Sequence, residues 1–186
     1  MPPIRPVELH PIIVHFPIAL LILGVTFDFL GVALRRWGLT DAATWLLVIG
    51  TPSAGVALLS GWVSEHYVTV GGAGEILHLH KVVAVLTTAL FSLLLFVRLV
   101  WLAPRGFERF ARVGALRPAL ASADGALRQI APRLYDPPLP AAAVALYLAL
   151  SVIGVGLLAL TGYLGGALVY DHGVGAPAGL ILSLFM

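Results

Sequence analysis

Four long apolar segments dominate this sequence and decide what it can fold into. They run roughly over residues 11–34, 42–63, 76–102 and 140–169. At a rise of about 1.5 Å per residue, each segment is long enough as an α-helix to cross the roughly 30 Å hydrocarbon core of a bilayer. Only 11% of the 186 residues are charged, whereas soluble domains carry about 25%. The sequence therefore predicts an all-α integral membrane protein whose main solvent is lipid.

The connections between these segments predict the topology. The stretch "RRWGLTD" joins the first segment to the second, and "SEHYVTVGGAGE" joins the second to the third. Connections this short place consecutive helices side by side and antiparallel. We therefore expect one transmembrane domain over residues 1–186, folded as an up-down-up-down four-helix bundle.

Two stretches fall outside the predicted spans. The loop at 103–139 is rich in arginine and broken by prolines, and apolar residues such as Phe107 and Phe110 recur in it about one helical turn apart. This pattern predicts a short helix lying on the cytoplasmic membrane surface, or alternatively a solvated linker. The apolar tail at 175–186 is too short to span a bilayer, and its role stays open.

The distribution of basic residues predicts the orientation, because cytoplasmic loops of membrane proteins carry an excess of lysine and arginine. One side of the predicted bundle holds only Arg5 and Lys81. The other side holds every remaining basic residue, namely Arg35, Arg36, Arg98, Arg105, Arg109, Arg112, Arg117, Arg128 and Arg133. We therefore expect a multi-pass protein of the bacterial inner membrane with both termini extracytoplasmic.

The composition also excludes several kinds of chemistry. The chain has no cysteine, which rules out disulfides, thiolate metal sites, iron–sulfur clusters and covalently attached c-type haem. The basic residues lie in loops rather than in one patch, so nucleic acid is not an expected partner. No nucleophile and base stand in a recognisable hydrolytic pattern, and whether the chain is an enzyme stays open.

All six histidines fall at the same end of the predicted bundle, the extracytoplasmic end. They open the first and third segments and follow the second and fourth. Ionisable residues inside a membrane bundle mark functional sites by default, although histidines at an interface also bond simply to loops and headgroups. The six residues are His10, His15, His66, His78, His80 and His172.

Helical spacing indicates which of these histidines can cooperate. His78 and His80 are two residues apart, so they point about 200° from each other and only one can face the interior. We expect His80 to face it, because it lies deeper in the span. His10 and His15 are five residues apart, about 140° around a straight helix, and cannot bind one ion from one face.

Two prolines shape the start of the first segment. Pro11 suits the first helical position, where a missing N–H costs nothing. Pro17 removes the hydrogen bond to the carbonyl of Ile13 and can bend that turn, which could turn His15 toward the interior.

Three motifs resemble a family of bacterial four-helix membrane proteins of unknown function, DUF2231. They are "HPIIVHFPIAL" (10–20), "LHLHKVVAVLTTALFSLLLFVRL" (77–99) and "LTGYLGGALVYDHGVGA" (160–176), and they match an HPxxVHFPIAL opening and a GGxLVYxHGVG close. The resemblance covers nearly the whole chain apart from the arginine-rich loop and the last ten residues. It implies the fold and the membrane location, and it implies no secure activity. By position, His10, His15, His80 and His172 fall on the motifs. The resemblance also favours redox chemistry, because relatives in this family occur alongside cytochrome-type modules.

The favoured hypothesis is a b-type haem protein that transfers electrons at the extracytoplasmic face. Haem iron takes two axial imidazoles from different helices, and an apolar bundle seals the edges of the ring. Lys81 and Arg5 are near enough in sequence to neutralise the haem propionates. Tyr170 or Tyr163 could donate a hydrogen bond to the ligand. The candidate axial ligands are His10, His15, His80 and His172.

Two other hypotheses remain open. A zinc, copper or iron ion could be held by three or four of the same imidazoles, with His66 and His78 as less favoured ligands and Glu65 or Asp171 completing the site. Alternatively, the chain could be an accessory subunit of a larger membrane complex or a homo-oligomer, with the histidines and the apolar tail as contact surface.

Two further features predict contacts inside the bundle. Asp28 lies in the first segment near its cytoplasmic end, and Arg98 lies at a similar depth in the third. Because an isolated charge there is costly, we expect a buried Asp28–Arg98 ion pair that holds the two helices together, with a proton or ion relay as the alternative. Gly162 and Gly166 form a GxxxG pattern, which predicts close helix packing or room for a flat ring such as a porphyrin.

Overall fold

Four long helices account for nearly all of the chain that the structure describes. The computed structural model describes residues 6–67, 71–99 and 141–171. The helices are α1 (Pro6–Ala33), α2 (Trp37–Glu65), α3 (Gly74–Val97) and α6 (Ala141–Tyr170), and a short 3₁₀ helix, η1 (Gly71–Ala73), precedes α3. Each of the four is long and apolar enough to cross a membrane, and the described residues contain no strand. The predicted all-α four-helix membrane fold is confirmed.

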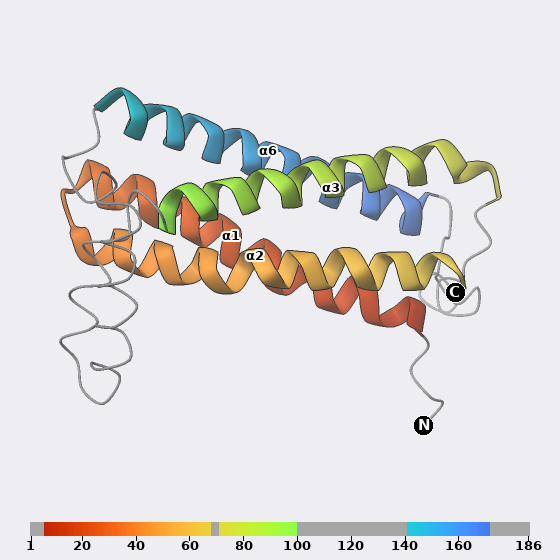
Figure 1. Ribbon diagram of the computed structural model, residues 1–186. Helices are drawn as coiled ribbons and strands as arrows, with labels where there is room; N and C mark the ends of the chain where they lie inside the picture. The colour runs from red at the N-terminus through yellow and green to blue at the C-terminus, as the bar shows by residue number, and fades with distance from the viewer. Residues whose placement is uncertain (1–5, 68–70, 100–140, 172–186) are drawn as a thin grey trace, which may run out of the picture.

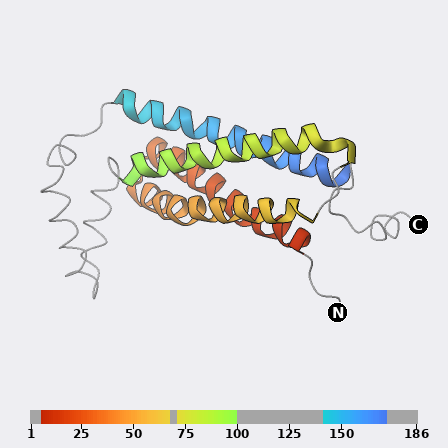
Figure 2. The same cartoon turned by 45° about the vertical axis from the view of Figure 1, so that its right-hand side comes forward.

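The helices form two antiparallel hairpins that pack into one bundle (Figures 1 and 2). Helix α1 packs most closely against α2, and α3 most closely against α6. Because α2 also contacts α3 and α1 also contacts α6, helices α1 and α3 lie diagonally opposite each other. We call the end where α1 and α3 begin, which carries His10 and His80, the histidine end. The opposite end, which carries Arg35 and Arg98, is the arginine end.

A tight turn links α1 to α2 at the arginine end. Arg35 adopts a φ of 52° in this turn, a left-handed conformation that is unfavourable for a residue with a side chain. Gly31 allows the two helices to approach closely, because a Cβ built at this glycine would lie 2.5 Å from Thr40 Cγ2. A larger residue at position 31 would therefore displace the start of α2.

The start of α1 differs from the prediction. The helix begins at Pro6, and both Pro11 and Pro17 lie inside it. The expectation that Pro11 occupies the first helical position is therefore wrong; Pro6 takes that place, where its missing N–H has no intrahelical acceptor. The surface helix predicted in 103–139 and the tail at 175–186 lie outside the described residues.

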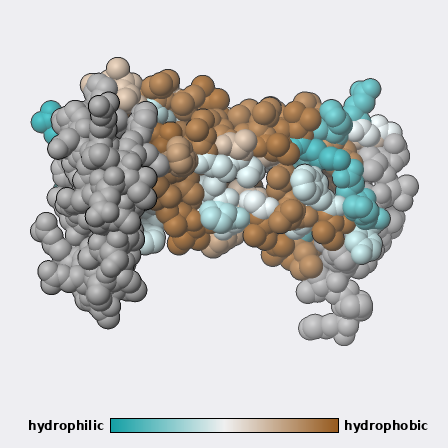
Figure 3. Space-filling view, viewed as in Figure 1, coloured by the Kyte–Doolittle hydropathy of each residue, from teal (hydrophilic) through white to brown (hydrophobic). Residues whose placement is uncertain are grey.

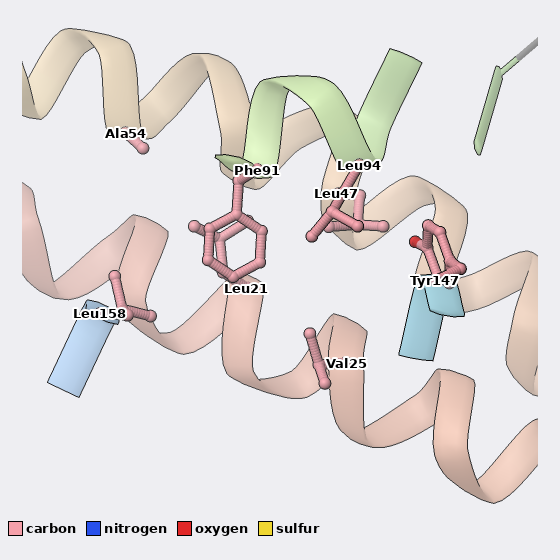
Figure 4. Packing of buried hydrophobic residues seen from close by; sticks show 8 residues of the cluster. All are labelled: Leu21, Val25, Leu47, Ala54, Phe91, Leu94, Tyr147 and Leu158. Atoms are coloured by element: carbon pink, nitrogen blue, oxygen red, sulfur yellow. The ribbon is translucent and has the colours of Figure 1, made fainter. Parts of the chain in front are cut away.

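The hydrophobic core lies midway along the bundle, where all four helices contribute side chains (Figure 4). Leu21, Leu47, Phe91 and Leu94 are at most 1% exposed. Large apolar side chains also cover most of the outer surface, and polar residues gather at the histidine end (Figure 3). A helix that is apolar all round is expected in a lipid environment, so the surface as well as the core fits a bilayer.

A buried ion pair joins all four helices near the arginine end. Arg98 Nη1 lies 2.6 Å from Asp28 Oδ1, and the two residues are only 5% and 1% exposed. Arg98 Nε also donates to Thr44 Oγ1 at 2.9 Å, and Arg98 Nη2 donates to the Thr40 carbonyl. The Tyr147 hydroxyl lies 3.4 Å from Asp28 Oδ2. Arg98 thus forms the ion pair that its depth predicts and is not a cation of the cytoplasmic surface.

Replacing Asp28 with Asn should lower the free energy of unfolding by about 3 kcal/mol or more, because it leaves the Arg98 guanidinium buried without its counter-charge. Thermal and denaturant unfolding in detergent micelles, followed by circular dichroism, would measure the change. The exposed Glu75→Gln variant in the first turn of α3 is the matched control and should unfold like the wild type. Equal stability of Asp28→Asn and Glu75→Gln would contradict the assignment.

Candidate histidine site

Five of the six histidines lie at the histidine end, as the predicted topology requires. The sixth, His172, lies outside the described residues. The structure separates the five into two kinds by burial and by hydrogen bonding. His10 and His80 are half-buried and bond to other helices, whereas the remaining three are exposed: His15, His66 and His78.

His10 projects from α1 against the end of α2. Its Nδ1 lies 2.9 Å from Ser60 Oγ. The Ser60 hydroxyl donates its own proton to the Ala57 carbonyl at 2.7 Å, so we assign it as the acceptor from His10 Nδ1–H. A Cβ built at Gly61 would lie 3.1 Å from His10 Cε1. The imidazole therefore lies directly against the backbone of α2, in space that only a glycine leaves free.

His80 projects from α3 against α6 in the same way. Its Nδ1 lies 3.1 Å from the Thr161 carbonyl oxygen, which can only accept a hydrogen bond. A Cβ built at Gly165 would lie 3.2 Å from His80 Cε1. His78 is exposed, so the inward-facing residue of this pair is His80, as its greater depth in the span predicts.

These bonds give both rings the same protonation pattern. Each carries its proton on Nδ1, which leaves the lone pair of Nε2 available to a ligand. A second hydrogen bond that fixes the tautomer in this way is the usual arrangement of a metal-bound histidine. The two rings come from the diagonally opposite helices α1 and α3. The arrangement can thus offer one neutral imidazole nitrogen from each hairpin to a ligand at the histidine end.

Polar contacts inside and beside the site tie the second hairpin together and join the two hairpins. Thr87 Oγ1 lies 3.2 Å from Thr161 Oγ1. This contact links α3 to α6 about two helical turns deeper in the bundle than His80. Lys81 Nζ donates to both carboxylate oxygens of Glu65 at 2.9 Å, which links α3 to the end of α2. Lys81 and Glu65 therefore bond to each other at the rim of the site.

Other predicted site residues do not join His10 and His80. His15 is exposed, and its Nδ1 lies 2.5 Å from the Pro11 carbonyl of its own helix. His66 is exposed as well, with Nδ1 2.9 Å from the Trp62 carbonyl. Tyr170 is 84% exposed. Within the described ranges, no three histidine, aspartate or glutamate side chains converge on one point, so His15 does not join His10 and His80 in a shared cluster there.

The glycines at which a neighbouring helix approaches closely differ from those that the sequence predicted. Nothing in the described structure lies within 4 Å of a Cβ built at Gly162 or Gly166, so these two residues do not mediate helix packing within that part of the chain. The close approaches occur instead at Gly61 and Gly165. Ser60, Gly61 and Thr161 were not identified from the sequence. The sequence feature that could have identified them is a glycine near the last turns of both α2 and α6, at the same depth in the bundle as the histidines.

Fold and site together define the class of protein: a four-helix integral membrane protein with an inward-facing histidine pair at one end. More particularly, the chain belongs to the family described as "Predicted membrane protein (DUF2231)", whose model matches residues 6–178. No curated protein and no solved structure gives a match to the chain. The family assignment therefore establishes kinship and a membrane location, and the chemistry has to be inferred from the site.

The two kinds of histidine should differ in chemical reactivity. Diethyl pyrocarbonate should modify His66 and His78 several-fold faster than His10 and His80, because the inner rings are half-buried and bonded to neighbouring helices. Peptide mass spectrometry after timed exposure of the detergent-solubilised protein would give each rate. Equal rates at His78 and His80, which differ by only two positions, would contradict the inward orientation of His80.

Proposed function

We propose that the protein is a membrane-integral b-type haem protein that transfers electrons at the extracytoplasmic face, with His10 and His80 as the axial ligands. One observation carries the proposal. Two half-buried imidazoles on diagonal helices each bond through Nδ1 to a neighbouring helix, and neither Nε2 has a hydrogen-bond partner among the described residues. Bis-histidine haem sites in helix bundles need this donor set, one imidazole from each of two facing helices.

The surroundings of the two histidines fit such a group. Gly61 and Gly165 allow the imidazole rings to lie close against the backbones of α2 and α6, where a side chain at either position would crowd the ring. The Ser60 hydroxyl and the Thr161 carbonyl fix the orientation of the rings. The absence of cysteine from the chain restricts the attachment to non-covalent binding.

When bound, the haem would supply reversible one-electron chemistry at its iron, and the chain would hold and orient it. His10 and His80 would hold the iron through their Nε2 atoms. The apolar side chains of the bundle would exclude water, and in haem proteins the burial of the site helps to set the reduction potential. Lys81, bonded to Glu65 at the rim, would lie on the side from which a redox partner approaches.

The number of inward-facing histidines favours haem over a bare metal ion. Structural and catalytic zinc sites use three or four protein ligands, whereas a haem needs only two from the protein. Among the described residues only His10 and His80 turn inward. A zinc, copper or iron ion would require His172 or a rearranged His15 in addition, and it becomes an outcome of the test below.

The proposal includes an orientation in the membrane. Arg35 and Arg36 lie at the arginine end, which the positive-inside rule assigns to the cytoplasm. The histidine end would then face the extracytoplasmic side of a bacterial inner membrane, with both termini on that side. Electron transfer would take place with a partner on that face, either a separate redox protein or a larger membrane complex.

Purified protein supplied with haem should show a Soret band and the spectrum of a low-spin, six-coordinate haem, at one haem per chain. His10→Ala and His80→Ala should each abolish the six-coordinate spectrum, and added imidazole should restore it, because the free ligand can occupy the vacated position. His15→Ala and His78→Ala are matched controls on the same two helices and should bind haem normally.

Other results would redirect or end the proposal. Loss of the six-coordinate spectrum in His172→Ala, with retention in His80→Ala, would move an axial ligand to His172. Stoichiometric metal by elemental analysis without haem absorbance would favour the non-haem site. A protein that takes up neither haem nor metal would leave the electron-transfer role without support.

The glycine contact offers a second test that spares the histidines themselves. Gly165→Val should lower haem occupancy several-fold, because the added side chain would push the His80 ring out of its place against α6. Gly162→Val, one turn away in open space, is the matched control. Haem occupancy per folded protein, measured from the absorbance ratio at fixed helicity, is the readout. Normal occupancy in Gly165→Val would show that the ring position observed here is not needed for binding.

A further inference from the structure

The two hairpins repeat each other in sequence. "LHP" at 9–11 corresponds to "LHK" at 79–81, and "LLVIG" at 46–50 corresponds to "LSVIG" at 150–154. His10 and His80 are 70 positions apart, and so are Asp28 and Arg98. Helix α1 therefore corresponds to α3 with one constant offset, and α2 corresponds to α6 with another. The arginine-rich stretch between α3 and α6 accounts for the difference between the offsets.

Packing inside the hairpins repeats as well. A Cβ built at Gly50 would lie 3.0 Å from Leu21 Cδ2, and one at the equivalent Gly154 would lie 3.1 Å from Phe91 Cζ. Leu21 and Phe91 are themselves equivalent under the offset that relates the histidines. At the histidine end, the contacts of His10 with Gly61 and of His80 with Gly165 follow the same rule. These close approaches thus recur at equivalent positions of the two hairpins, as they would in the halves of a two-fold dimer.

Burial on α1 and α3 follows the same correspondence. The buried residues of α3 and of its last turn fall on equivalent buried positions of α1, apart from one half-buried position. The four fully matched pairs are Pro17 with Thr87, Leu21 with Phe91, Gly24 with Leu94, and Asp28 with Arg98. Asp28 and Arg98 therefore occupy the same place in the two hairpins and meet across the pseudo-two-fold axis of the bundle.

Opposite charges at this place select which hairpins pair. In a two-fold assembly, residues on the axis face their own equivalents. Two copies of the first hairpin would bring two Asp28 carboxylates together, and two copies of the second would bring together two Arg98 guanidinium groups. Like charges buried in such a position cost several kcal/mol. Only the first hairpin with the second gives the 2.6 Å ion pair.

The same contact ties α1 to α3 along the diagonal. These helices touch each other little compared with their neighbours in the hairpins, so the ion pair is a direct link between them. Asp28 follows His10 by the same number of residues as Arg98 follows His80, about 27 Å along each helix at 1.5 Å per residue. Fixing Asp28 level with Arg98 therefore fixes His10 level with His80.

We infer that Asp28 and Arg98 are positioning residues for the histidine pair: they join the unlike hairpins and set the axial register of α1 against α3. The inference goes beyond haem binding and does not depend on it. A purely stabilising pair would hold the bundle together without being needed for the alignment of the distant histidine end. The two roles can be separated because stability and register respond to different substitutions.

The register can be measured directly, because the chain has no native cysteine. Leu9 and Leu79 are equivalent, exposed positions next to the two histidines. Spin labels on a Leu9→Cys/Leu79→Cys variant should give one narrow distance distribution by pulsed electron–electron double resonance in detergent or nanodiscs. Asp28→Glu on that background keeps the charge and should retain the narrow distribution.

The decisive variant is Asp28→Leu/Arg98→Leu on the same background. Exchange of a buried ion pair for apolar residues is often neutral or stabilising, so this variant should fold with near wild-type thermal stability. Its distance distribution should nevertheless broaden or shift by several ångströms, on the order of the 5.4 Å pitch of one helical turn. A narrow, unshifted distribution in a folded double variant would overturn the inference. Failure of the double variant to fold would also overturn it, since the pair would then serve stability.

Discussion

The absence of water from the bilayer core is the constraint on which the rest of this structure depends. A polar group there must find its partner within the protein. Most threonine and serine hydroxyls in the described helices bond back to the carbonyl one turn earlier, as Thr87 does to Val83 and Ser151 to Tyr147. Among the buried side-chain nitrogen and oxygen atoms of that region, only Thr51 Oγ1 has no hydrogen-bond partner. Each polar contact between helices therefore carries positional information, because a mismatch could not be repaired by solvent.

The same constraint gives meaning to the hydrogen bonds of His10 and His80. His66 and His78 are exposed at the same end, and the Nδ1 of His66 bonds to the Trp62 carbonyl of its own helix. His10 and His80 instead face inward against glycines and satisfy one nitrogen each with a neighbouring helix. Their second nitrogens then lie in a half-buried region where solvent is limited. A ligand that binds imidazole would give these nitrogens a partner, which is the physical reason for proposing a cofactor at this site.

Much of the fold was predictable from the sequence because membrane spans depend on length and apolar composition alone. The helix boundaries differ from the expected spans by a few residues, and the Asp28–Arg98 contact followed from matched depth on two helices. Helical spacing allowed only one of His78 and His80 to face inward, and the greater depth of His80 selected it. Depth and rotation about a single helix are properties that one sequence encodes locally, so these predictions needed no knowledge of packing.

The partners of the histidines could not be predicted in the same way. The inward position of His10 rather than His15 depends on how α1 rotates against α2, and that rotation is set by close approaches at Gly50 and Gly61. A glycine in the sequence indicates only that a neighbouring group can approach the backbone closely. Which group does so depends on how the two helices pack along their whole interface. The repeat between "LLVIG" and "LSVIG" could have supplied this information, because equivalent glycines imply equivalent contacts.

The correspondence between the two hairpins, together with the opposite charges of Asp28 and Arg98 at equivalent positions, accounts for the difference between the two ends of the molecule. At the histidine end the hairpins contribute the same residue type, which suits a group that takes two like ligands from opposite sides. Near the arginine end they contribute opposite charges, which suits pairing between unlike halves. A chain with two identical hairpins could offer the first property without the second. Combining both in one polypeptide fixes which hairpins meet and, by the register inferred above, holds the two histidines at a common depth.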